Sequence, residues 1–112
     1  MKKIKMVLIF GSVVFMASCQ SNTIAEISPI VTNPTYVANI KPIFDSQCTS
    51  CHSNGDRFPD LTTYAKVRDA VENGNVLCRI NGSCGGIMPQ SGKMSQVVLD
   101  EITTWKNLGY IN

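Results

Sequence analysis

The sequence predicts an all-α fold built from about three helices. Apolar side chains recur at helical spacing in three segments, and two of these segments begin beside a residue that commonly caps a helix. Stretches rich in Gly, Pro and Asn separate the segments. No convincing run of alternating apolar and polar residues indicates a β-strand. These helices all fall within residues 34–112, which we therefore expect to form the folded domain.

The first expected helix covers residues 35–47, with Thr35 available as its N-cap. The apolar residues that share one face of this helix are Val37, Ile40, Ile43 and Phe44. Pro42 lies inside the segment and removes one backbone donor, so a kink or a late start of the helix is expected.

The other two expected helices lie in the second half of the chain. The second spans residues 62–73, and Gly74 can end it. The third has Ser95 as N-cap and Gly109 just after its last turn. The apolar positions at helical spacing are Tyr64, Val67 and Val71 in the second, and Val98, Leu99, Ile102, Trp105 and Leu108 in the third.

The first 18 residues have the pattern of an export signal. Three lysines precede an almost unbroken apolar run over residues 6–17. This run is shorter than the about 20 residues of a membrane-spanning helix and suits the apolar part of a signal peptide. We therefore expect residues 1–18 to direct export and to be removed.

Cys19 closes this segment. The stretch Met16-Ala17-Ser18-Cys19 resembles the lipobox of bacterial lipoproteins, although that site usually has Leu where this chain has Met16. The resemblance implies lipidation of Cys19 and a membrane lipoprotein that faces the bacterial periplasm; the alternative is an ordinary secreted protein. Residues 19–33 are polar and lack a helical stripe, and we expect them to form a flexible tether.

The charge of the chain excludes one class of partner. Three of the ten Lys and Arg residues lie in the signal segment, which leaves seven basic and eight acidic side chains, a net charge of −1, from residue 19 onward. That part contains no cluster of basic residues interleaved with aromatic ones. No nucleic-acid partner is therefore expected.

The motif Cys48-Thr49-Ser50-Cys51-His52 predicts covalent attachment of one c-type haem. Two thiols at this spacing can form thioethers with the two vinyl groups of one haem, and the following His can ligate the iron. Thioredoxin-like redox pairs open a helix in a βαβ unit, and zinc sites need a second ligand pair of comparable spacing. The sequence shows neither, and a plain disulfide would leave the only histidine unexplained.

A methionine is the expected sixth ligand of the iron. Met88 lies between Gly85-Gly86 and Pro89, in a loop that can approach a flat haem face, and its thioether favours reduced iron. Met94 lies only six residues further on and is the alternative. A methionine can also simply fill a core, in which case the sixth position is open or filled by another ligand.

Residues 36–110 resemble the small class I monohaem cytochromes c. The resemblance depends on a helix ending in Cys48-x-x-Cys51-His52, a Met88-Pro89 turn 36 residues after the His, and a closing helix with Trp105 before Gly109. It implies a three-helix wrap around one haem, His52 and Met88 as axial ligands, and one-electron transfer. It also implies that Pro59 supports the imidazole through a nearby carbonyl. Tyr64, Leu99, Ile102 and Trp105 are expected to line the haem or to pack in the core.

Two of the five cysteines remain after lipidation and haem attachment. Cys78 and Cys84 are free to pair with each other, since export places them where disulfides persist. This pair is not part of the common cytochrome pattern. It is expected either to stiffen the segment that presents Met88 or to staple a loop that has no core of its own.

These expectations combine into an electron carrier that exchanges single electrons with redox proteins of the periplasm or membrane, with no small-molecule substrate. One alternative is a haem enzyme or ligand sensor, peroxidase-like or gas-binding, which would need an open or labile sixth iron position. The other is a lipoprotein without haem, with structural or binding duties. The visible spectrum of the exported protein discriminates among all three.

Overall fold

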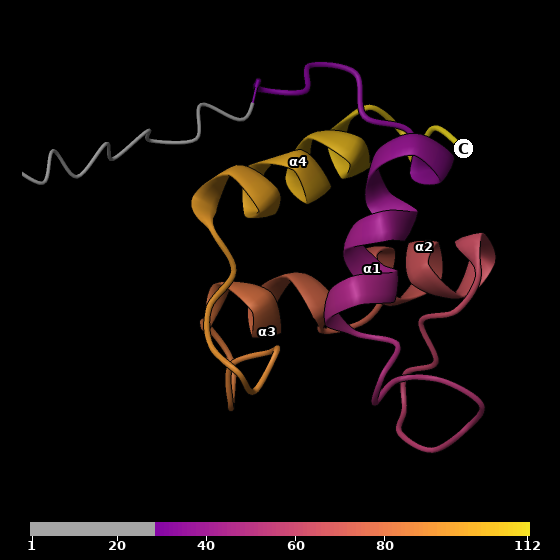
Figure 1. Cartoon of the computed structure of the whole chain (residues 1–112), viewed down its shortest axis with the longest axis vertical. Helices are drawn as coiled ribbons and strands as arrows, with labels where there is room; N and C mark the ends of the chain where they lie inside the picture. Colours follow the sequence, from indigo (N-terminus) through magenta and orange to yellow (C-terminus); the bar gives the residue numbers. More distant parts are fainter. Residues whose placement is uncertain (1–28) are drawn as a thin grey trace, which may run out of the picture.

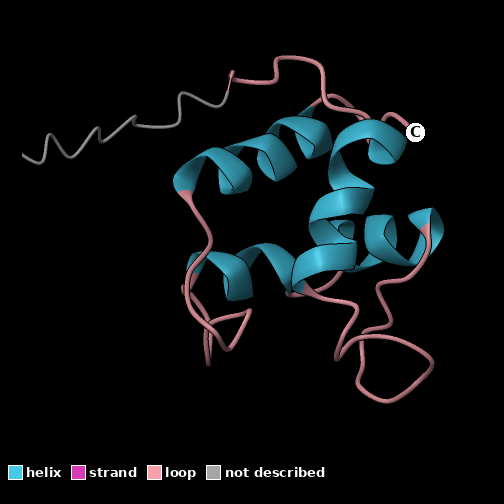
Figure 2. Ribbon diagram, viewed as in Figure 1, coloured by secondary structure: helices cyan, strands magenta, loops and turns pink. Residues whose placement is uncertain are grey.

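The structure is a computed structural model that describes residues 29–112. This part of the chain is helical and contains no strand (Figure 1, Figure 2). Its elements are η1 (Tyr36–Ile40), α1 (Lys41–Gln47), α2 (Tyr64–Glu72), α3 (Val76–Asn81) and α4 (Gln96–Asn107). The all-α prediction is confirmed. The expected signal segment, Cys19 and the first part of the expected tether lie outside the described residues.

The first predicted helix is present but has two parts. Thr35 is its N-cap, and the Thr35 hydroxyl accepts the backbone N–H of Ala38. The turn η1 is a π-helix, and α1 follows it without a break, with Pro42 in the first turn of the α-helix. Proline is tolerated there because its fixed φ suits a helix and its missing N–H would have no acceptor within α1 itself. The late start expected from Pro42 is therefore confirmed.

The second and third predicted helices correspond to α2 and α4. Helix α2 begins at Tyr64, two residues later than expected, since Thr63 accepts the N–H of Lys66 and acts as N-cap. Ser95 caps α4 by accepting the N–H of Val98. Both helices bury one face, which consists of Val67, Ala70 and Val71 in α2 and of Leu99, Ile102 and Trp105 in α4.

The prediction of about three helices was incomplete, because a further helix, α3, lies between α2 and α4. Its six residues are fewer than two helical turns, too few to show a clear apolar period in the sequence. Val76 and Ile80 form its buried face, and Gly82, with a φ of 71°, ends it in the left-handed region that glycine adopts without steric cost.

Trp105 lies at the centre of an aromatic core. Its side chain is fully buried, and the rings of Tyr36, Tyr64 and Tyr110 lie 6.1, 6.3 and 4.9 Å from it between centroids. The indole N–H donates to the carbonyl of Ile111 at 2.8 Å, and the same carbonyl accepts the N–H of Tyr36. These contacts join η1, α2 and α4 to the last described residues.

The beginning of the described chain runs over this core. Residues 29–33 form no helix, and Pro34 is the first residue that is buried. Figure 1 shows this segment (indigo) leading into the first helical turn. Within residues 29–112, no helix combines the length and the apolar character needed to span a membrane.

Candidate cofactor site

A cavity of about 1010 Å³ lies between the end of α1, the loop that follows it, α2 and α3. This volume is at the upper end of the range found for cofactor sites. Cys48, Cys51, His52 and Met88 all line the cavity. The structure therefore brings together the four residues that the sequence analysis proposed for haem attachment and iron ligation, although Met88 is far from the others in the chain.

The cysteine motif forms a tight turn at the carboxyl end of α1. Cys48 is the C-cap, and its N–H donates to the carbonyl of Phe44 at 2.9 Å. The carbonyl of Cys48 in turn accepts the N–H of Cys51 at 3.1 Å and of His52 at 2.9 Å. This turn places Cys48, Cys51 and His52 on the cavity, with Cys48 partly buried and Cys51 exposed.

The environment of Cys48 does not suit a redox dithiol. Burial raises the pKa of the Cys48 thiol to about 11. Reactive Cys-x-x-Cys pairs have a lowered thiol pKa, commonly because the first cysteine lies at a helix N-terminus. Cys48 instead lies at the C-terminal end of α1, where the helix dipole disfavours a thiolate. The geometry therefore argues against a thioredoxin-like reaction.

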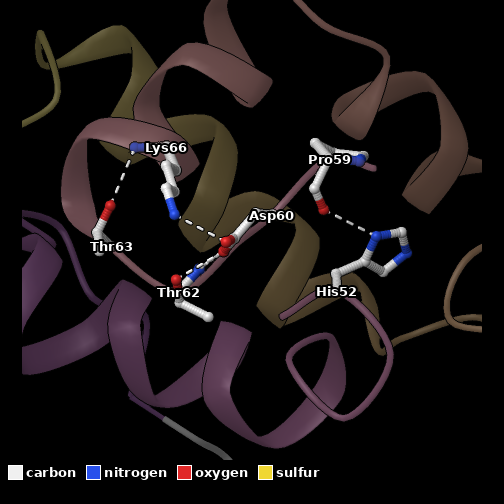
Figure 3. A network of polar contacts seen from close by, with 6 residues as sticks. All are labelled: His52, Pro59, Asp60, Thr62, Thr63 and Lys66. Carbon is white, nitrogen blue, oxygen red and sulfur yellow. Dashed lines mark hydrogen bonds and ion pairs between the residues drawn. The ribbon is translucent and has the colours of Figure 1, made fainter. Parts of the chain in front are cut away.

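His52 is held by a single backbone acceptor (Figure 3). Its Nδ1 lies 2.9 Å from the carbonyl oxygen of Pro59. A carbonyl can only accept, so Nδ1 carries a proton, and in the neutral imidazole the lone pair then lies on Nε2. Histidines that ligate metals almost always donate their other ring N–H in this way. The carbonyl contact implied by the cytochrome resemblance is present in the structure.

The segment that carries Pro59 is fixed at the start of α2 by polar contacts that the sequence did not reveal (Figure 3). The carboxylate of Asp60 accepts the hydroxyl of Thr62 at 2.6 Å and pairs with the ammonium of Lys66 at 2.7 Å. The N–H of Leu61 donates to the carbonyl of His52 at 2.9 Å. These bonds hold the two sides of the loop together and so position the imidazole.

The Asp60 carboxylate gives the fold a pH dependence. Hydrogen bonds from Lys66 and Thr62 lower its pKa from 3.8 to about 2. Because the pKa of Asp60 is lower in the folded chain than in the unfolded chain, the ionised carboxylate stabilises the fold. This stabilisation is fully present above about pH 4 and is lost as the pH falls toward about 2. We expect Asp60→Asn to have a lower free energy of unfolding than the wild type at neutral pH. The difference in free energy between the two proteins should decrease as the pH falls from about 4 toward about 2. Urea unfolding of both proteins over a pH series measures this; a difference independent of pH would contradict it.

Of the two candidate methionines, only Met88 lies on the cavity that holds His52. Met88 is partly buried, and its N–H donates to the carbonyl of Arg79 at 3.1 Å. Met94 instead packs against the core and lines a smaller hollow of about 390 Å³, between α1 and the start of α4. The arrangement favours Met88 as the partner of His52.

The remaining cysteines pair as expected. The structure joins Cys78 to Cys84, with Cα atoms 5.4 Å apart, which is within the usual range for a disulfide. Their thiols are therefore not available as ligands for a zinc ion. Leu99, Ile102 and Trp105 belong to the core and the partly buried Tyr64 packs against it; none of the four is among the residues that line the cavity.

Comparison of the chain with protein-family models, curated proteins and solved structures finds no significant match. The functional assignment therefore depends on the cavity itself. Its wall is partly apolar, through Leu61, Ala70, Val76 and Ile80. It also holds the paired Asp60 and Lys66, the carboxylate of Asp69, and the cations Arg57 and Arg79; these last three form no ion pair within residues 29–112. Such a wall suits a large, flat, mainly apolar group that carries carboxylates, and haem has this chemistry.

Proposed function

We propose that this protein is a one-electron carrier with one covalently bound haem c. Cys48 and Cys51 would hold the haem through thioethers, and His52 and Met88 would be its axial ligands. The observation that carries the proposal is that Cys48, Cys51, His52 and Met88 all line one cavity. When bound, the haem iron supplies the one-electron redox chemistry.

The residues of the chain prepare the site for this role. The Pro59 carbonyl holds the proton of His52 on Nδ1, which leaves Nε2 as the donor to a metal. Met88 offers a soft sulfur that favours the reduced state and so raises the reduction potential. Leu61, Val76 and Ile80 are buried or nearly so and exclude water from one wall of the cavity.

Access to the site fits exchange with another protein. Cys51 and Phe58 both line the cavity and are both exposed, Phe58 to 97%. One side of the cavity is therefore open at the surface of the molecule, where electrons can pass to a partner without a substrate entering. We propose redox proteins of the periplasm or membrane as partners, and a lipid anchor on Cys19 as the link to the membrane.

The test is a redox-titrated visible spectrum of the full chain produced together with a cytochrome c maturation system. The proposal expects covalent haem, a low-spin spectrum and a far-red band from iron–methionine ligation in the oxidised protein. A chain exported without haem would overturn the proposal. A high-spin ferric spectrum would favour a haem enzyme or ligand sensor instead.

Met88→Ala is expected to remove the far-red band and to lower the reduction potential by on the order of 0.1 V, because axial ligands shift haem potentials over about 0.8 V. Met94→Ala is the matched control, since it removes the same side chain from the other hollow. Its spectrum and potential should remain those of the wild type. The opposite pattern would identify Met94 as the ligand.

A further inference from the structure

We infer that the Cys78–Cys84 disulfide positions Met88 for ligation, so that both cysteines are positioning residues of the redox site. This inference rests on the proposed function. It concerns a pair of residues that a haem site does not itself require. Three features of the structure carry it: the attachment of α3 to the core, the bond from α3 to Met88, and the lack of buried side chains in the segment between.

Helix α3 is the fixed side of the arrangement. Val76 and Ile80 are buried in the core and also line the cavity. Arg79, between them on the helix, accepts the N–H of Met88 through its carbonyl at 3.1 Å. The backbone of Met88 is therefore tied to α3, and α3 is in turn tied to the cavity wall.

The segment that leads from α3 to Met88 has little else to hold it. No side chain between Ile80 and Leu99 is buried. Gly82 and Gly85 adopt φ values of 71° and 59°, so the loop turns back on itself through glycines, which have the most conformational freedom to lose. Ser83 adds two bonds to the carbonyl of Cys78, from its N–H at 2.8 Å and its hydroxyl at 3.2 Å.

The disulfide joins this loop to α3 and so limits how far the loop can move away from the helix. Cys78 lies on α3 and Cys84 on the loop, four residues before Met88. The bridge therefore confines the glycine-rich part to a short ring and keeps the Met88 N–H within reach of Arg79. A disulfide that only staples the loop would change global stability alone, whereas a positioning disulfide also changes how readily Met88 leaves its place.

The experiment compares the oxidised haem-loaded full chain with its Cys78→Ser/Cys84→Ser variant. Imidazole is the probe, because it can occupy the iron only when Met88 dissociates. We expect imidazole to bind the variant roughly tenfold more tightly, since loss of the cross-link restores loop entropy to the open state. Hydrogen exchange at the Met88 amide should also become faster in the variant.

Two further variants keep the inference open to refutation. Gly85→Ala, which retains the disulfide, places a Cβ against the Arg79 guanidinium at a positive φ and should shift imidazole binding in the same direction. Tyr64→Phe removes the hydrogen bond to the Tyr110 carbonyl, at 2.7 Å and away from the cavity, and should lower stability without changing imidazole binding.

The two failures can be told apart. The double serine variant could bind imidazole and exchange the Met88 amide as the wild type does. That result would overturn the positioning role of the disulfide and would leave the proposed electron-carrier function unaffected. A wild-type chain without haem or without the far-red band would remove the proposed ligation and this inference together.

Discussion

Replacing both Cys48 and Cys51 with alanine is expected to abolish covalent haem attachment completely. The thiols are the only free cysteines within residues 29–112, and both line the cavity beside His52. Without a thioether the cofactor can leave, and the cavity of about 1010 Å³ then stays open in a small domain. Because small domains bury a limited apolar surface, we also expect a clear loss of stability.

The measurement is haem staining after denaturing electrophoresis, together with the intact mass of the exported chain. Ser50→Ala is the matched control, since Ser50 lies between the two cysteines and is exposed. It should attach haem as the wild type does. Haem that survives denaturation in the double alanine variant would show that attachment does not use these thiols.

Trp105→Ala is expected to be the most destabilising single substitution in the core. Removal of a fully buried tryptophan costs about 3–5 kcal/mol, a large share of the about 5–15 kcal/mol by which small domains are stable. The substitution also removes one of the hydrogen-bond donors to the Ile111 carbonyl, and it leaves a void among the rings of Tyr36, Tyr64 and Tyr110. Denaturant unfolding of the haem-loaded protein, followed by circular dichroism, measures the change.

Trp105→Phe separates packing from hydrogen bonding. It keeps an aromatic ring among the tyrosines and loses the indole N–H, so its cost should be about 1–2 kcal/mol. A cost for Trp105→Ala no greater than for Trp105→Phe would mean that the aromatic cluster contributes little. The haem stain should be positive in both variants, because Trp105 does not line the cavity.

The helices that could be predicted are those with a long apolar period and a clear cap. Ser95 with five apolar positions after it predicted α4, and Thr35 with Pro42 predicted the first helix and its late start. Helix α3 was missed because its six residues are too few to show an apolar period, and only Val76 and Ile80 of them are buried. Asn75 lies before this helix and Gly82 after it, but Asn and Gly are also common in ordinary loops, so they did not indicate a helix.

The candidate site could be predicted only where its chemistry has a local signature. The spacing of Cys48, Cys51 and His52 carries such a signature, and the Met88-Pro89 turn carries a weaker one. The ion pair of Asp60 with Lys66 and the bond from Met88 to Arg79 carry none, because they depend on how the loops return in space. These contacts position the site residues, and only the folded chain reveals them.

The carbonyl of Ile111 has a consequence for the order of folding. It accepts hydrogen bonds from Tyr36, at the start of the domain, and from Trp105, near its end. The first helix therefore lacks this hydrogen-bond partner until Ile111 is in place. A contact of such long sequence separation is expected to form late in folding, because the entropy of closing a long loop opposes it.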